Sequence, residues 1–280
     1  MKASPLQPEP PVVEIHAHDG WVPLRLRELV EFRELLWFFV WRDLKGRYRQ
    51  MALGPLWMIL HPLINTVLFT LLFSRLAKVP SDNLPYPLFT YSALLLWSFF
   101  SQCTETSSMS LLGFRNLIAK VYFPRLLVPL VGILSAALEF VVSFFILLAV
   151  FWSFGYPPTL AWLAAPFVLL PAAILGLVIG IWTAPAVVHF RDVSQIIGFG
   201  LRAAMYLSPV VYPSSLVPEK WRGLYELNPM VPILDAWRAI LFGQPVPWSG
   251  LLYPLALGLP LLIAGAYVFR RSERNIVDVA

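Results

Sequence analysis

Long uncharged stretches, separated by short segments that carry most of the charge, are the main pattern of this chain. A helix needs about 20 mostly apolar residues to cross the roughly 30 Å hydrocarbon core of a bilayer. The uncharged run from Phe140 to Phe190 is too long for one crossing, and the glycine and prolines at 155–158 divide it. The pattern predicts six membrane-spanning helices, at residues 56–75, 88–110, 129–152, 161–187, 195–213 and 248–269.

Two further segments have the pattern of helices that do not cross a membrane. Residues 28–52 repeat apolar side chains at helical spacing beside basic ones, as a helix lying on a membrane surface does. A helix packed on a soluble domain is the alternative. Residues 214–247 contain two short helical patterns, at 219–226 and 233–242, which we expect to be re-entrant because they cannot cross. An ordinary capping loop is the alternative there.

The expected fold class is therefore an all-α integral membrane protein: six transmembrane helices with an N-terminal amphipathic interface helix and short re-entrant helices before the last span. Residues 1–27 are rich in proline and lack the apolar core of a signal peptide, so a flexible cytoplasmic tail is expected there. Residues 28–52 are then the interface helix, and residues 53–280 form the transmembrane domain.

Composition supports a membrane protein and weighs against a nucleic-acid binder. Of the 280 residues 58% are hydrophobic and 13% charged, with a mean hydropathy of +0.70. Soluble domains have about 45–50% apolar and about 25% charged residues. In so apolar a chain the net charge of +5 reflects orientation, because lysine and arginine gather in cytoplasmic loops. Fifteen of the 21 lie on the side of the termini and five on the other, which predicts cytoplasmic termini.

No familiar pattern of a catalytic or metal site occurs in the sequence. It contains no phosphate-binding loop, no dinucleotide fingerprint, no H-E-x-x-H pair and no G-x-S-x-G elbow. Cys103 is the single cysteine, which excludes a disulfide framework and a cysteine-based zinc site. These absences favour transport or scaffolding over catalysis, and they leave the chain without a recognisable ATP site.

A series of short motifs follows in a fixed order over residues 30–280. The segments are Arg42–Tyr48, Leu53–Trp57, Tyr86–Phe89, Trp97–Phe100, Asn116–Arg125, Phe190–Val193, Ser208–Pro213 and Leu227–Met230. Together they resemble the membrane subunit of ABC exporters for polysaccharides, the class that exports O-antigen, capsule or teichoic-acid chains. The chain departs from the family pattern at Ala93, where glycine is expected, and at Arg202 inside the fifth span.

The resemblance implies a permease subunit of the inner (plasma) membrane that exports a lipid-linked polysaccharide from the cytoplasm. It implies a homodimer joined to two copies of a separate ABC ATPase, which would bind ATP and Mg²⁺, so that this chain is no enzyme and needs no cofactor. Membrane lipid is the further expected partner, and nucleic acid is not one. A permease for a small lipid, drug or haem-like substrate is the alternative, and a scaffold or an enzyme with a dispersed site is a third.

The resemblance also assigns a role to the loop at 112–128. It corresponds to the coupling helix, which docks in a cleft of the ATPase, with a plain amphipathic connector as the alternative. The expected contact residues are Asn116, Lys120, Tyr122, Phe123, Pro124 and Arg125.

The substrate path calls for aromatic rings, because they stack on the apolar faces of sugars. The candidates, each with packing or lipid contact as its alternative, are Trp97, Phe100, Tyr206 and Tyr212. Arg202 is expected either to hold a lipid-linked pyrophosphate or to pair with Glu105 or Glu139. The basic residues expected to attract lipid phosphates at the membrane surface are Arg42, Lys45, Arg47 and Arg49.

Overall fold

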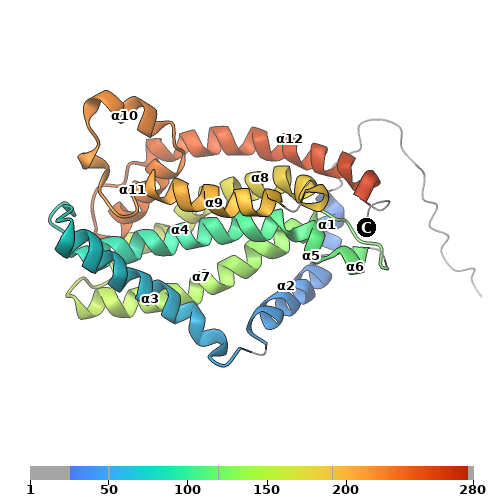
Figure 1. Ribbon diagram of the computed structural model, residues 1–280, viewed down its shortest axis with the longest axis horizontal. Helices are drawn as coiled ribbons and strands as arrows, with labels where there is room; N and C mark the ends of the chain where they lie inside the picture. Colours follow the sequence, from blue (N-terminus) through green and yellow to red (C-terminus); the bar gives the residue numbers. More distant parts are fainter. Residues whose placement is uncertain (1–25, 50, 119, 191, 277–280) are drawn as a thin grey trace, which may run out of the picture.

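The computed structural model describes residues 26–49, 51–118, 120–190 and 192–276 (Figure 1). Helices are the regular elements in this part of the chain, and most of the long ones run roughly side by side. The long helices are α3 (Trp57–Phe69, continued by the π-helix η2, Thr70–Leu76), α4 (Tyr86–Ser108), α7 (Leu127–Ser153), α8 (Ala165–His189, preceded by η3, Leu160–Ala164), α9 (Asp192–Tyr206) and α12 (Leu252–Ile276, preceded by η5, Trp248–Leu251).

Four of these helices are long and apolar enough to cross a membrane. They cover Trp57–Leu76, Leu127–Ser153, Leu160–His189 and Trp248–Ser272, at the positions of the first, third, fourth and sixth predicted spans. The second predicted span is α4, which has sufficient length but carries several polar side chains. The count of six spans therefore stays a prediction.

The fifth predicted span, at 195–213, is too long at its C-terminal end. The helix found there, α9, has 15 residues and ends at Tyr206. Proline has no N–H to donate and disfavours helical conformation in the residue before it. Pro209 and Pro213 follow Tyr206 closely, which explains why the helix stops short of the expected boundary.

Helix α4 is the centre of the bundle and packs against α3, α7, α8, α9 and α11. Its contact with α8 is very close because Gly176 and Gly180 of α8 face it. A Cβ atom at Gly180 would lie 2.2 Å from the Cβ of Ser107, and one at Gly176 would lie 2.7 Å from the Cβ of Cys103. A small-x-x-x-small spacing permits such approach of two helices in a membrane protein.

The predicted interface helix is present as two pieces, α1 (Leu26–Glu31) and α2 (Arg33–Tyr48). Phe39 and Val40 are buried in a cluster shared with the start of α7, whereas Trp37, Phe38 and Trp41 are exposed. Helix α2 thus packs on the bundle with one apolar face and presents a second apolar face outward.

The region 214–247 contains the two short helices that the sequence predicts. Helix α10 (Glu219–Glu226) lies on the surface, and α11 (Met230–Leu241) is enclosed between α4 and α8. Trp237 of α11 is fully buried, and its indole N–H donates to the carbonyl of Ser92 at 2.8 Å. The short 3-10 helix η4 (Ser214–Leu216) precedes them. The region thus combines a surface helix, α10, with a buried helix, α11.

The two ends of the bundle differ in what they carry. Figure 1 places α1, the short helices α5 (Ser110–Gly113) and α6 (Arg115–Ile118) and the last turns of α12 at one end, with α10 at the other. The N-terminal helix α1, the end of α12 and the described part of the loop 112–128 thus lie at the same end of the bundle, whereas the two termini themselves lie outside the described residues. Which side faces the cytoplasm stays a prediction from the charges.

Candidate functional site: a polar face and a pocket in an apolar bundle

One side of α4 is polar and accessible, although most of this helix is buried. Ser98 and Glu105 are exposed and Gln102 is half-buried. Their spacing of four and three residues puts them on the same side of the helix. Polar side chains that face lipid are energetically costly. This face is therefore suited to water, to a polar substrate or to another protein surface.

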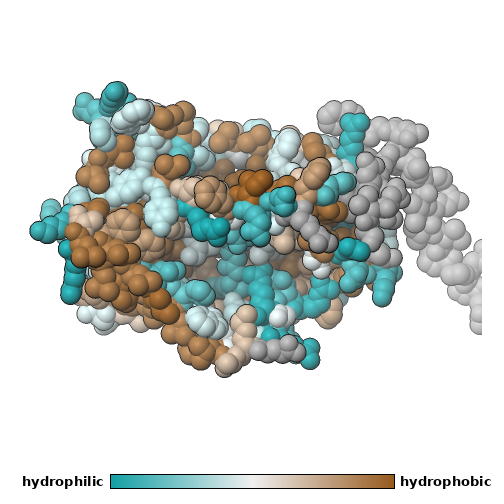
Figure 2. Space-filling view, viewed as in Figure 1, coloured by the Kyte–Doolittle hydropathy of each residue, from teal (hydrophilic) through white to brown (hydrophobic). Residues whose placement is uncertain are grey.

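The polar face lies between two helices that expose apolar side chains. Helices α3 and α9 both pack against α4, and Figure 2 shows a hydrophilic area in the middle of this side of the molecule, beside the apolar surface over α3. Leu68 of α3 and Leu72 of η2 are about half exposed, and Ile196 and Phe199 of α9 are more exposed still. The face is thus a polar floor with apolar borders.

The contacts of the charged residues in this region differ in part from those that the sequence suggested. Arg202 of α9 is exposed, and its charge acts on the carboxylate of Glu105, but the expected pairing of these two side chains stays a prediction. The expectation that Arg202 pairs with Glu139 is wrong, because Glu139 forms its ion pair with Arg47 of α2, at 3.4 Å. Residues 47 and 139 are 92 positions apart, so no local pattern links them.

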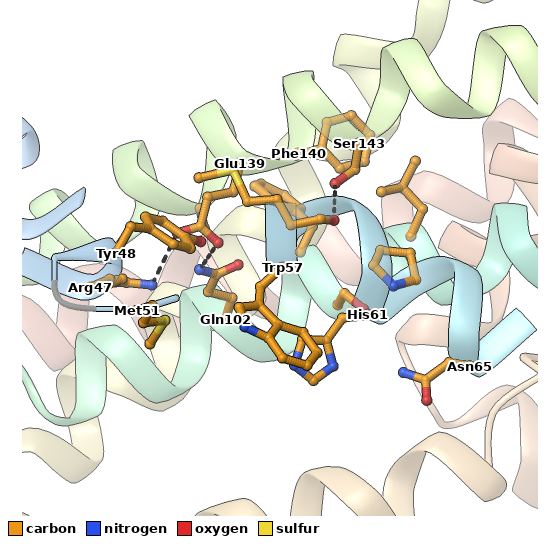
Figure 3. Close-up of a pocket in the computed structure, with 16 residues that line it drawn as sticks. Arg47, Tyr48, Met51, Trp57, His61, Asn65, Gln102, Glu139, Phe140 and Ser143 are labelled. Carbon is orange, nitrogen blue, oxygen red and sulfur yellow. Dashed lines mark hydrogen bonds and ion pairs between the residues drawn. The ribbon is translucent and has the colours of Figure 1, made fainter. Parts of the chain in front are cut away.

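A pocket of about 550 Å³ lies where the end of α2 meets α3, α4 and α7 (Figure 3). Trp57, Phe99 and Phe140 contribute aromatic walls. The polar residues that line it are Arg47, Tyr48, His61, Asn65, Ser98, Gln102, Glu139 and Ser143. The pocket is continuous with the polar face of α4, since Ser98 and Gln102 belong to both.

A hydrogen-bond network centred on Glu139 closes one end of the pocket. Its carboxylate accepts from Nη1 of Arg47, from the amide of Gln102 and from the phenol of Tyr48. Nη2 of Arg47 also donates to Asp43, at 2.7 Å. Burial raises the pKa of Tyr48, and the charge of Glu139 acts in the same direction, so the phenol remains protonated and donates. The network ties α2 to both α4 and α7.

A second polar cluster lies at the opposite end, where three of the sequence motifs meet. The phenol of Tyr86 donates to the carbonyl of Val211 at 2.8 Å, and the amide of Asn228 donates to Ser208 at 2.9 Å. Arg238 is buried, donates to the carbonyl of Val210 at 3.0 Å and lies over the ring of Phe89. These contacts anchor the segment that follows α9.

Asp235 is the acidic partner in this second cluster. Ser214 donates to its carboxylate at 2.8 Å. Burial raises the pKa of Asp235, although the bond from Ser214 and the charge of Arg238 act against the rise. The ionised form is therefore less favourable here than in water.

The residues expected to contact an ATPase divide into exposed and buried ones. Asn116, Lys120 and Tyr122 are exposed, with Tyr122 at 72%, and Pro124 and Arg125 are half-buried. Phe123 differs, because only 4% of it is exposed and its ring packs edge-on against Phe39 at 5.2 Å. The structure therefore places Phe123 in the core and leaves Tyr122 as the aromatic residue on the surface.

The four aromatic residues expected along a substrate path also differ in exposure. Trp97 and Phe100 are 5% and 4% exposed, and their rings pack edge-on at 5.3 Å. This burial matches the packing alternative, because the two rings lie in the core of a single chain. Tyr206 is half exposed at the end of α9, and Tyr212 is half-buried beside Tyr225.

The four basic residues expected at the membrane surface have different surroundings. Arg42 lies over the ring of Phe114 at 4.3 Å, and Arg47 is in the pocket network. Lys45 and Arg49 are exposed and keep their charges outward. Arg42, Lys45 and Arg49 are all exposed, so the expected contact of these basic residues with lipid phosphates stays a prediction.

Sequence reasoning missed several polar residues that the structure brings together. Ser98 with Gln102 on α4, and His61 with Asn65 on α3, line one pocket. Both pairs have i, i+4 spacing inside predicted spans, which places each pair on one side of its helix. Searching the apolar stretches for polar pairs at this spacing would have found them.

The apolar helices, together with a polar face on the central one, define a multi-pass helical membrane protein. Comparison with known proteins adds the family. Residues 34–242 match the ABC-2 type transporter family. The O-antigen export system permease protein RfbA of Myxococcus xanthus is 32% identical, over 89% of this chain and 96% of that protein.

Other relatives cover the chain to a similar extent. The O-antigen export system permease protein RfbA of Klebsiella pneumoniae is 26% identical over 85% of this chain and 92% of its own length. The capsule polysaccharide export inner-membrane protein CtrC of Neisseria meningitidis is 25% identical over 90% of this chain and 96% of its own length. The chain belongs to the ABC-2 type transporter family, so it is a membrane subunit of a transporter.

Proposed function

We propose that this chain is the permease subunit of an ATP-driven exporter, which moves a lipid-linked polysaccharide of the O-antigen or capsule type out of the cytoplasm. The named relatives export O-antigen or capsule polysaccharide. The observation that carries the proposal is the polar face of α4, formed by Ser98, Gln102 and Glu105 within an apolar bundle. A hydroxyl-rich polymer needs such a surface, because lipid cannot satisfy its hydrogen bonds.

The exposed helices beside this face support a homodimer. Helix α3 buries little of its surface within the chain, and Leu68, Leu72 and Phe199 are exposed around the polar floor. A second copy placed against these helices would cover the apolar borders and enclose the polar face between the two subunits. Two such faces would then form one path that is shielded from lipid.

The end of the bundle that carries α6 is the proposed ATPase contact. Asn116, Lys120 and Tyr122 are exposed there, and aromatic residues are frequent energetic centres of interfaces. With the termini on the cytoplasmic side, two ATPase copies would bind ATP and Mg²⁺ and act through this loop.

Deletion of the gene tests the function. We expect polymer to accumulate inside the cell and to disappear from the surface, with recovery when the wild-type chain is supplied. Polymer that still reaches the surface without this chain would contradict the proposal, and it would favour a permease for a small lipid or drug.

A further inference from the structure

The positive charge in the pocket between α2, α3, α4 and α7 is already neutralised by the protein. Among the described residues that line this pocket, Arg47 is the single arginine, and none is a lysine. Arg47 is 2.7 Å from Asp43 and 3.4 Å from Glu139. Glu139 lines the pocket itself, whereas Asp43 lies outside the lining and binds the same guanidinium. Because Arg47 is already paired with two carboxylates, an acidic ligand would gain little from it and would meet the carboxylate of Glu139 at close range, where the medium is less polar than water.

Other polar side chains of the same pocket have hydrogen-bonding groups available to a ligand. The side chains of His61, Asn65 and Ser98 form no hydrogen bond to the described residues. An imidazole, an amide and a hydroxyl both donate and accept hydrogen bonds, as the hydroxyls of a sugar do.

Aromatic rings stand beside these polar groups. Trp57 and His61 are 5.0 Å apart, and the two rings lie together at the pocket in Figure 3. Phe99 and Phe140 form a second wall, with ring centroids 5.4 Å apart. Flat aromatic faces beside polar groups that can bind hydroxyls suit a sugar ring, which has apolar C–H faces and a hydroxyl-rich edge.

We propose that this pocket binds an uncharged sugar residue and that Glu139, which lines it, disfavours an acidic one, while Asp43 helps to neutralise Arg47. The inference rests on the proposed function and deepens it, because it gives the exporter a site that distinguishes neutral from acidic sugars. The specificity comes from a carboxylate held in place by Arg47, Tyr48 and Gln102.

Two alkyl glycosides that differ in one carboxylate test the specificity. Octyl β-D-glucopyranoside and octyl β-D-glucuronide have the same tail and ring, and both are titrated below micelle concentration into the full-length protein in phosphatidylcholine nanodiscs. Binding is followed by saturation-transfer-difference NMR, with empty nanodiscs to subtract partitioning. We expect the glucoside to bind about tenfold more tightly. Equal affinities, or tighter binding of the glucuronide, would overturn the proposal.

Variants of the pocket locate the binding. Ser98→Leu fills the pocket and Trp57→Ala removes a wall, so each is expected to weaken glucoside binding about tenfold. Trp152→Ala and Ser153→Leu change exposed residues at the far end of α7 and serve as matched controls. Wild-type affinity in both pocket variants would contradict the location.

A third variant tests the role of the carboxylate. Glu139→Gln keeps the size of the side chain but leaves Arg47 with one acidic partner, so the preference for glucoside over glucuronide should shrink severalfold. An unchanged preference in a variant with a normal melting temperature would overturn the role given to Glu139.

Failure of this proposal is distinguishable from failure of the proposed function. If cells that lack the chain still display polymer, the exporter assignment fails, whatever the nanodisc result. If display depends on the chain but both Ser98→Leu and Trp57→Ala bind the glucoside normally, only the pocket proposal fails.

Discussion

Arg47 on the helix that precedes the first span lies 3.4 Å from Glu139 on α7, and this contact fastens α2 to the bundle. The two side chains are 26% and 13% exposed, so the pair is partly shielded from solvent. Because Asp43, Tyr48 and Gln102 complete the network, the C-terminal end of α2 is held against α4 and α7. A movement of α2 would have to break these bonds.

Removing the carboxylate should therefore loosen α2. Glu139→Ala leaves Arg47 and Gln102 without their shared acceptor, and we expect a loss of about 1–3 kcal/mol. The melting temperature of the purified protein should fall, and limited proteolysis should cut faster between α2 and α3.

The matched control for this variant is an exposed ion pair. Arg27 and Glu31 on α1 are 3.9 Å apart and largely exposed, and such pairs contribute little. Glu31→Ala should leave the melting temperature unchanged. If Glu139→Ala and Glu31→Ala behave alike, the network does not fasten α2.

The contact between α4 and α8 should not tolerate a larger residue at Gly180. A Cβ there would come within 2.2 Å of the Cβ of Ser107, so Gly180→Ala forces the two helices apart at a cost of about 1–3 kcal/mol. The yield of monodisperse protein and its melting temperature measure the effect. Gly223→Ala is the control, because nothing lies within 4 Å of a Cβ at that position; equal stability of the two variants would contradict the close packing.

Substitution of the neighbouring residues Phe123 and Tyr122 should affect two different properties, stability in one case and recovery of the ATPase in the other. Phe123→Ala empties a site in the core and should destabilise the protein by about 3–5 kcal/mol. Tyr122→Ala removes an exposed ring, so the protein should remain folded while less ATPase subunit is recovered with it. Melting temperature and co-purification separate the two effects. Normal recovery of the ATPase with Tyr122→Ala would remove this residue from the proposed contact.

The raised pKa of Asp235 predicts a dependence of stability on pH. Because burial favours the protonated carboxyl, the stability that this group contributes is greatest below its ordinary pKa and falls as pH rises through the raised value. Asp235→Asn lacks the titration, so its melting temperature should gain on that of wild type as pH increases over this interval. A difference between the two proteins that stays constant with pH would contradict the prediction.

The sequence predicted the long helices well because their cause is local. A bilayer satisfies no backbone hydrogen bonds, so an apolar stretch of sufficient length must be helical. The helices beginning at Trp57, Leu127, Leu160 and Trp248 follow from this rule. Local chemistry also explains why α9 ends earlier than predicted, because the prolines that follow Tyr206 are visible in the sequence and disfavour a longer helix.

Site residues were harder to predict, because exposure depends on neighbours that are distant along the chain. Trp97 and Ser98 are adjacent, yet the ring is in the core and the hydroxyl is at the pocket. Successive residues of a helix point about 100° apart, so packing against α7 and α8 decides which of them faces inward. Tyr122 and Phe123 differ in the same way, because only one of them reaches Phe39 of α2.

The sequence by itself determined that this chain is an apolar helical membrane protein, where its long helices lie and which transporter class its motifs resemble. These properties depend on composition, on the lengths of uncharged stretches and on motif order. The tertiary structure decided which side of α4 is polar and open, and that Glu139 pairs with Arg47 instead of Arg202. Such contacts depend on how helices rotate and pack against one another, and residues 92 positions apart meet only after the chain has folded.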